Sequence, residues 1–268
     1  MRLLLQATRP PRGPGDPQGR RQGLRRLAAA AALAWTALAA QAAPPDPDRL
    51  ARPVRLAEGQ SSAELRGRVT GRQYIDHTLR ASAGQRLTLS LRSPHQALYF
   101  NLLPPGEREA AMAIGEQSDN RFDGLLPDDG TYTVRVFLLR AAARRNESAG
   151  FTLSVGLAGA PLRPLPAHAD ARVAGTRYHA IAATACEPMY TRTRECEARV
   201  VRRGTDGTAT VELAWDGDRR RRILFLHGEP KASDTHQPMS AVRTGQGWRV
   251  SFNAEEHFEI PDALVHGG

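Results

Sequence analysis

Hydrophobic and polar residues alternate along much of the first half of the chain. The run RLTLSLR at Arg86–Arg92 places its three leucines on one side and its polar residues on the other, and Tyr132–Leu138 repeats the pattern. A period of two residues is typical of a strand with one buried face. Turn-forming segments such as Pro127–Gly130 (PDDG) separate these runs. The pattern predicts an antiparallel β-sandwich of about seven or eight strands over residues 54–157.

The alternating pattern stops over residues 158–174 and resumes beyond them. This segment, AGAPLRPLPAHADARVA, is rich in proline and reads as a linker. Short runs of β composition follow, and Trp215–Asp218 (WDGD) carries the Asp-Gly pair of a tight hairpin turn. We therefore expect an all-β chain, with a second, small β-rich domain over residues 175–268.

Residues 1–42 have the features of a signal peptide with an N-terminal extension. The basic stretch RRQGLRR precedes the apolar run Leu27–Leu38, and Ala40-Gln41-Ala42 offers small residues for cleavage. The apolar run is shorter than the roughly 20 residues that a spanning helix needs. We predict a periplasmic or secreted protein without stable membrane insertion after cleavage.

Most of the net positive charge lies in this leader. The chain carries a formal charge of +9, but residues 1–42 hold seven arginines against one acid, Asp16. The remainder is only mildly basic, whereas a domain that binds phosphate backbones keeps a strong basic field. We therefore expect no nucleic acid among the partners.

The chain contains two cysteines, Cys186 and Cys196, both in the second domain. In an oxidising compartment a close, even pair predicts one disulfide across a loop or hairpin. A zinc site would need further ligands.

No segment carries a recognised catalytic motif. The sequence lacks a Gly-x-Ser-x-Gly elbow, a His-Glu-x-x-His helix and a phosphate-binding glycine loop. Its eight histidines are scattered without ligand spacing. We expect a protein that is not an enzyme and that needs no metal or cofactor.

Arg219–Arg222 (RRRR) is the densest run of charge in the second domain. Phosphate groups of a lipid or of nucleic acid could attract it. We interpret it instead as a solvated hairpin strand.

Several pieces of the first domain resemble the family of periplasmic inhibitors of g-type lysozyme. The resemblance covers residues 54–157 and does not reach the second domain. It is carried by five segments: Gly59–Ala63 (GQSSA), Gly71–Asp76 (GRQYID), Ala83–Gln85 (AGQ), Phe100–Gly106 (FNLLPPG) and Leu126–Arg145 (LPDDGTYTVRVFLLRAAARR).

The segment RAAARRNE, which begins at Arg140, suits an inhibitory role. Lysozymes cleave their substrate with carboxyl groups in a deep cleft. An arginine inserted there can form a charge-assisted pair with a carboxylate while the surrounding loop blocks the substrate. The resemblance implies that the arginine pair Arg140 and Arg144 contacts g-type lysozyme and so protects peptidoglycan.

The resemblance also implies lysozyme contacts for Arg72, Tyr74 and Asp129. The family commonly has an aromatic residue where this chain has Arg72, and often a small hydroxyl residue where it has Asp129. An aspartate would repel a catalytic carboxylate, so Asp129 could instead orient Arg140 or cap the turn. The alternative function is a non-catalytic β-sandwich module that binds a glycan of the cell envelope.

Overall fold

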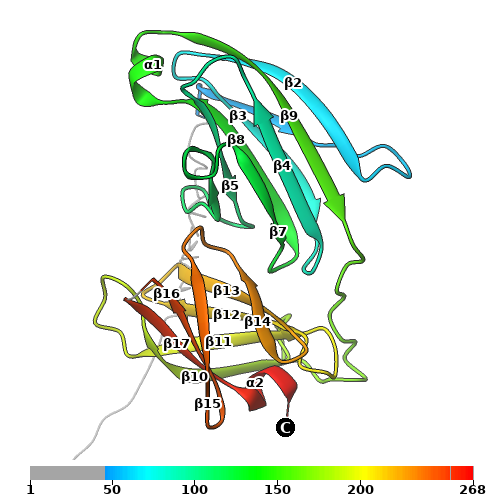
Figure 1. Cartoon of the computed structure of the whole chain (residues 1–268). Coiled ribbons are helices and arrows are strands. Elements are labelled where there is room, and N and C mark those ends of the chain that lie inside the picture. Colours follow the sequence, from blue (N-terminus) through cyan, green and yellow to red (C-terminus); the bar gives the residue numbers. More distant parts are fainter. Residues whose placement is uncertain (1–45, 254, 268) are drawn as a thin grey trace, which may run out of the picture. The chain divides into compact units, whose positions relative to one another are not determined.

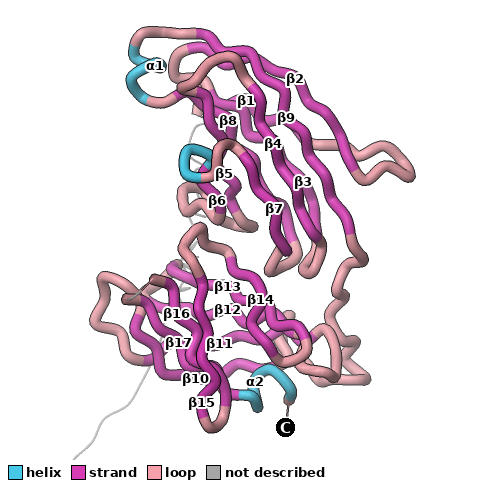
Figure 2. Tube along the Cα trace, viewed as in Figure 1, coloured by secondary structure: helices cyan, strands magenta, loops and turns pink. Residues whose placement is uncertain are grey.

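The computed structural model describes residues 46–253 and 255–267, so the predicted signal peptide lies outside the described residues. Regular structure is almost entirely β, as the sequence predicts (Figures 1 and 2). The described helices are α1 (Arg140–Arg144), α2 (Asp262–His266) and a 3-10 turn at Gly115–Gln117. Within the described ranges, no helix combines the length and apolarity required to traverse a bilayer.

The first domain is a sandwich of a five-stranded and a four-stranded sheet, which confirms the predicted fold class. The strand orders are β1-β3-β8-β5-β6 and β2-β9-β4-β7. The strands of this domain are β1 (Arg49–Pro53), β2 (Ser62–Thr70), β3 (Tyr74–Ala81), β4 (Arg86–Arg92), β5 (Leu98–Leu103), β6 (Ala113–Ile114), β7 (Arg121–Leu125), β8 (Gly130–Leu138) and β9 (Ser148–Ala158). β1, which precedes the predicted domain boundary, is exposed and pairs in parallel with β3.

The apolar residues of the alternating runs are buried, as the sequence predicts. In β8 the side chains of Tyr132, Val134, Val136 and Leu138 are buried, and in β4 the three leucines are buried. These side chains form one hydrophobic core between the two sheets. The Tyr132 hydroxyl donates a hydrogen bond to the Asp128 carbonyl oxygen, 2.8 Å away, which ties the turn before β8 to the strand.

The core face of β3 also contains an imidazole. His77 is 3% exposed, lies edge-on to Phe151 and has no hydrogen-bond partner on either ring nitrogen among the described residues. Burial lowers the pKa of His77 to about 4, because the charged imidazolium would lose its hydration, and Arg52 contributes in the same direction.

The second domain is one curved antiparallel sheet in the order β14-β13-β12-β11-β10-β17-β16-β15. Its strands are β10 (Ala180–Glu187), β11 (Glu195–Arg202), β12 (Ala209–Trp215), β13 (Arg219–Leu226), β14 (Glu229–Ser233), β15 (Met239–Thr244), β16 (Gly247–Phe252) and β17 (Glu256–Pro261). The predicted turn joins β12 to β13, with Asp216 and Gly217 both at positive φ. The predicted disulfide is present and joins Cys186 to Cys196.

The sandwich and the curved sheet pack together within one compact unit that begins at Pro45. At the centre of the contact, Arg203 donates to Asp128 at 3.1 Å and to Asp129 at 2.8 Å. The Arg203 side chain is 0% exposed and that of Asp128 2%. Arg177 adds a second pair to Asp128 at 2.7 Å. Because a buried charge is costly without a partner, these residues need one another.

The arginine run Arg219–Arg222 is not the solvated strand that the sequence suggested. Arg222 is 4% exposed and pairs with Glu212 at 2.9 Å, while Arg221 pairs with Glu256 at 2.8 Å. Arg220 reaches Glu107 of the sandwich at 3.3 Å. Only Arg219 keeps an exposed position. Acidic residues pair with three of the four arginines, so the run offers little charge to an external phosphate.

Residues 159–179, which include most of the predicted linker, contain no strand but make specific contacts with both domains. The backbone N–H of Leu162 donates to Ala83 of the sandwich at 3.0 Å, and that of Leu165 donates to Arg202 at 2.8 Å. The connection is therefore held to both domains.

Replacement of Arg203 should destabilise the protein. Arg203→Ala leaves Asp128 buried with fewer partners, a loss that typically costs about 3–5 kcal/mol of the free energy of unfolding. Chemical denaturation measures this loss. Arg219→Ala, which removes an exposed arginine of the same sheet, should change the free energy by less than about 0.5 kcal/mol. Equal effects of the two substitutions would contradict the buried pairing.

His77 should make stability depend on pH. Its pKa is about 4 in the folded protein and about 6.5 when unfolded, so the unfolded chain binds the extra proton between these values. The contribution of neutral His77 to the free energy of unfolding is fully present above pH 6.5. It falls as the pH drops toward 4, by about 3 kcal/mol in total. His77→Leu should abolish this part of the dependence when melting curves of the two proteins are compared from pH 4 to 8. Parallel pH profiles would show that His77 carries no such linkage.

Candidate functional site

Helix α1 presents the predicted arginine pair at one end of the sandwich (Figure 1). Arg140 and Arg144 are both exposed and lie four residues apart, so their side chains leave the same face of the helical turn. Ala142 between them is 0% exposed and packs into the sandwich core. No ion pair or side-chain hydrogen bond within the described ranges engages either guanidinium. The short alanines let the helix pack closely while the two cations point outward.

The turn between β2 and β3 lies against the loop that follows α1. Gly71 has a φ of +58° and donates its N–H to the Glu147 carbonyl at 2.9 Å. This positive φ favours glycine, and a Cβ here would also lie 2.4 Å from the Asn146 side-chain oxygen, which would have to move. The contact explains why a glycine stands directly before Arg72.

A cavity of about 450 Å³ lies where these two segments meet. Arg72 and Arg144 both line it, together with Asp48, Thr70, Gln73, Ala143 and Asn146. Arg72 is exposed and lies 3.5 Å from the Asp48 carboxylate. The structure thus brings Arg72 to Arg144, which the sequence places far apart.

Tyr74 stands on the outer face of β3 beside this turn. Its hydroxyl donates to Asp46 at 2.7 Å, and the Arg135 guanidinium stacks 4.5 Å from the centre of its ring. The pKa of Asp46 is lowered by that hydrogen bond, whereas burial and the bond to Asp46 raise the pKa of Tyr74. Tyr74 is therefore a neutral, oriented donor on the surface rather than a core residue.

Asp76 holds the stacked arginine in place. Its carboxylate is 1% exposed and accepts hydrogen bonds from Arg135 at 2.8 Å and from Arg49 at 2.7 Å. The bond to Asp76 raises the pKa of Arg135 further. This pair fixes Arg135 over the Tyr74 ring.

The same end of the sandwich carries a second, larger groove of about 630 Å³. Arg68, Arg92 and His95 line it, and Gly150 forms part of its floor. Arg145 is engaged by Glu147 at 2.5 Å, and His95 lies 2.9 Å from the same carboxylate. Arg145 is thus exposed and paired with Glu147. Around α1, arginines outnumber acids: Arg68, Arg72, Arg92, Arg140, Arg144 and Arg145 against Asp46, Asp48 and Glu147.

Asp129 lies at the other end of the sandwich. It precedes β8, whereas Arg140 follows it, so the nine residues of that strand separate the two side chains. Its carboxylate accepts from the Ala83 N–H at 3.0 Å and pairs with Arg203 at 2.8 Å. Asp129 does not orient Arg140; it stabilises the turn and the contact with the second domain.

The sandwich is similar to known proteins. A protein of Escherichia coli (strain K12) described as an inhibitor of g-type lysozyme is 27% identical over 104 residues, which are 38% of this chain and 77% of the relative. The crystal structure of Aeromonas hydrophila PliG, a periplasmic inhibitor of g-type lysozyme, is 34% identical and matches over 41% of this chain and 97% of that protein, with a TM-score of 0.39. The sandwich belongs to the family of g-type lysozyme inhibitors.

A second solved inhibitor, PliG of Salmonella Typhimurium, is 22% identical over 40% of this chain and 97% of its own, with a TM-score of 0.34. No family model matches the chain. The solved inhibitors are described as periplasmic, in agreement with the export that the sequence predicts. The matches cover about two fifths of the chain.

The residues around Tyr74 escaped the sequence analysis. Asp46 and Asp48 precede the predicted domain, and Arg135 reads as an ordinary polar position of an alternating strand. Their roles depend on the pairing of β3 with β8, in which Asp76 opposes Arg135. The alternation that predicts the strand at Tyr132–Leu138 marks Arg135 as a polar position but does not indicate its partner.

Proposed function

We propose that this protein inhibits g-type lysozyme in the periplasm and thereby protects peptidoglycan. The observation that carries the proposal is the exposed pair Arg140 and Arg144 on a helix anchored by Ala142, in a sandwich of the inhibitor family. In this mechanism α1 enters the lysozyme cleft, and the two guanidinium groups pair with its carboxylates.

The surroundings of α1 support this mechanism. Arg72 lines the same cavity as Arg144, and Tyr74 adds a hydroxyl and an aromatic edge beside it. The excess of arginines at this end would attract an acidic groove from a distance. Because Gly71 and Ala142 hold the two segments together, little conformational entropy would be lost when the surface binds.

The second domain restricts the surface to this end. Its Arg203 engages both Asp128 and Asp129, and Thr210 donates to the Pro127 carbonyl at 2.7 Å. We therefore assign Arg140, Arg144, Arg72 and Tyr74 to the lysozyme contact and leave Asp129 out of it.

Removal of the arginine pair should abolish inhibition. Arg140→Ala with Arg144→Ala removes two charged contacts, each of which typically contributes several kcal/mol, so the inhibition constant for g-type lysozyme should rise by at least about a hundredfold. The melting temperature should not change, because both side chains are exposed. Lysis of a cell-wall suspension measures inhibition, and calorimetric titration with the lysozyme measures binding.

Two controls accompany this experiment. Arg80→Ala removes an exposed arginine near the other end of β3 and should leave inhibition intact. A c-type lysozyme should remain active at excess inhibitor. Full inhibition by the double variant, or none by the native protein against several g-type enzymes, would refute the proposal.

Asp129 provides the complementary test. Asp129→Asn should leave inhibition of g-type lysozyme unchanged but lower the free energy of unfolding by about 1–3 kcal/mol, because a hydrogen-bonded partner of buried Arg203 loses its charge. Inhibition and urea denaturation are measured on the same preparation. A variant that is stable but no longer inhibits would return Asp129 to the contact surface.

A further inference from the structure

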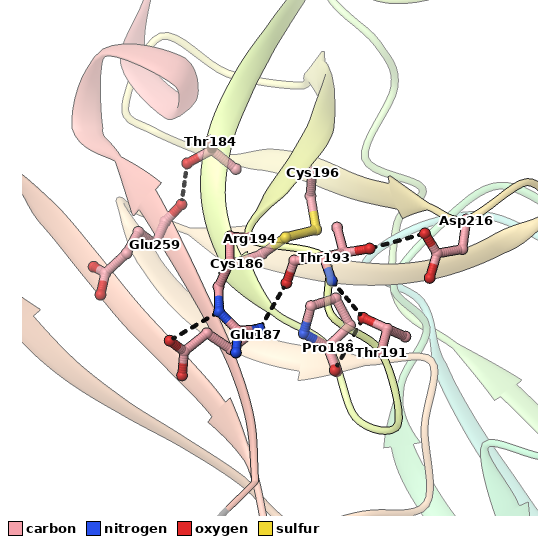
Figure 3. The surroundings of a disulfide bond; sticks show 10 residues. All are labelled: Thr184, Cys186, Glu187, Pro188, Thr191, Thr193, Arg194, Cys196, Asp216 and Glu259. Atoms are coloured by element: carbon pink, nitrogen blue, oxygen red, sulfur yellow. Dashed lines mark hydrogen bonds and ion pairs between the residues drawn. A yellow bond between two sulfur atoms is a disulfide. The ribbon is translucent and has the colours of Figure 1, made fainter.

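The loop between β10 and β11 lies on the second domain, outside the part of the chain that matches the inhibitors. The disulfide Cys186–Cys196 closes it, and Figure 3 shows the hydrogen bonds that surround the bond. Thr193 donates to Asp216 at 2.8 Å, and the Thr191 hydroxyl accepts from the Thr193 N–H at 3.1 Å. The Cys186 N–H donates to the Arg194 carbonyl at 3.1 Å. The loop is therefore held in a defined shape.

Tyr190 at the tip of this loop is unusual in two respects. Its ring is 90% exposed, the largest value among the exposed large hydrophobic and aromatic residues of the described chain. Its φ is +61°, in the left-handed region that a bulky residue rarely adopts. The ring contributes little to the hydrophobic core, and the backbone is strained by holding it. Strain of this kind gathers at binding sites, where the surrounding structure imposes it.

A cavity of about 350 Å³ adjoins the ring. Its lining includes Glu187, Arg194, Glu255 and His257 as well as Tyr190. His257 lies opposite Glu187 in the pairing of β10 with β17, and its Nδ1 is 2.8 Å from the Ser251 hydroxyl. That contact orients the imidazole and leaves Nε2 as its second polar atom. The lining thus offers both hydrogen-bond donors and acceptors, with the Arg194 guanidinium 4.0 Å from the Glu187 carboxylate.

We propose that this loop and cavity bind a saccharide, with Tyr190 as the platform on which a sugar ring stacks. The C–H groups on one face of a pyranose pack well against an aromatic ring, and the tyrosine hydroxyl adds a polar group at the edge of that ring. Sugar hydroxyl and acetamido groups both donate and accept hydrogen bonds, as the carboxylates, guanidinium and imidazole around the cavity require. Two carboxylates against one guanidinium disfavour a phosphate or another anion.

This site would give the second domain a role that does not depend on lysozyme. A glycan of the cell wall is the saccharide within reach of a periplasmic protein, and binding to it would hold the inhibitor on the polymer that it protects. The two surfaces lie on different domains, so a substitution can abolish binding at one and leave the other intact.

Calorimetric titration of the full mature protein with an N-acetylglucosamine tetramer, together with sedimentation on purified peptidoglycan, tests the site. The native protein should bind, and Tyr190→Phe should bind equally, because it keeps the ring. Tyr190→Asn should weaken binding by about tenfold or more. Since asparagine tolerates positive φ, this variant should melt at the same temperature or about 2–4 °C higher.

Two further variants separate the possible results. Val242→Asn, at an exposed apolar position of β15 on the same sheet, should bind as the native protein does. The variant that lacks Arg140 and Arg144 should also bind normally. Absence of native binding to both glycans, or undiminished binding by Tyr190→Asn, overturns the inference. Loss of lysozyme affinity in Tyr190→Asn with glycan binding intact would overturn it as well and would make the loop a protein contact.

Discussion

The neutralisation of Asp128 by arginines of the second domain is the constraint on which the arrangement of the described chain depends. Asp128 is buried, and Arg203, Arg177 and Arg222 all lie within ion-pair distance of its carboxylate. Asp128, Arg203 and Arg222 are buried and could not be so without partners, because the desolvation of an unpaired ion costs several kcal/mol, a large part of the stability of a typical protein. The network therefore couples the turn before β8 to the curved sheet. It also engages the turn at Asp128 and Asp129, which is why we propose the opposite end of the sandwich as the contact surface.

At the opposite end, Arg140 and Arg144 have no ion-pair partner among the described residues. α1 is anchored through Ala142, whereas Arg140 and Arg144 extend from it. Arginines inside the network stabilise the fold, and arginines on α1 are available for an external carboxylate. The distinction lies in the neighbours, because the side chains are identical. A rigid support for exposed cations is the property that an inhibitor of an acidic cleft requires.

The second domain adds a different kind of surface. Its core is apolar and closed by a disulfide, yet the loop at that disulfide holds Tyr190 outward at positive φ. The described protein thus combines a basic end on the sandwich with an aromatic tip beside a polar cavity on the curved sheet. The two surfaces differ in chemistry, and we propose a different ligand for each.

The sequence by itself determined the features that depend on near neighbours in the chain. Alternation identified β4 and β8 and their buried faces, the Asp-Gly pair located the turn after Trp215, and the only two cysteines could form only one disulfide. The four-residue spacing of Arg140 and Arg144 placed them on one face. Tertiary structure decided which charged residues are paired and where residues adopt strained backbone conformations. Asp129 is engaged by Arg203 of the other domain, and Arg222 lies near Asp128 of the sandwich as well as its hairpin neighbour Glu212. Arg72 and Arg144 line one cavity because the turn at Gly71 packs on the loop after α1. Strand register and burial depend on pairings between residues far apart in the chain, which local patterns do not encode.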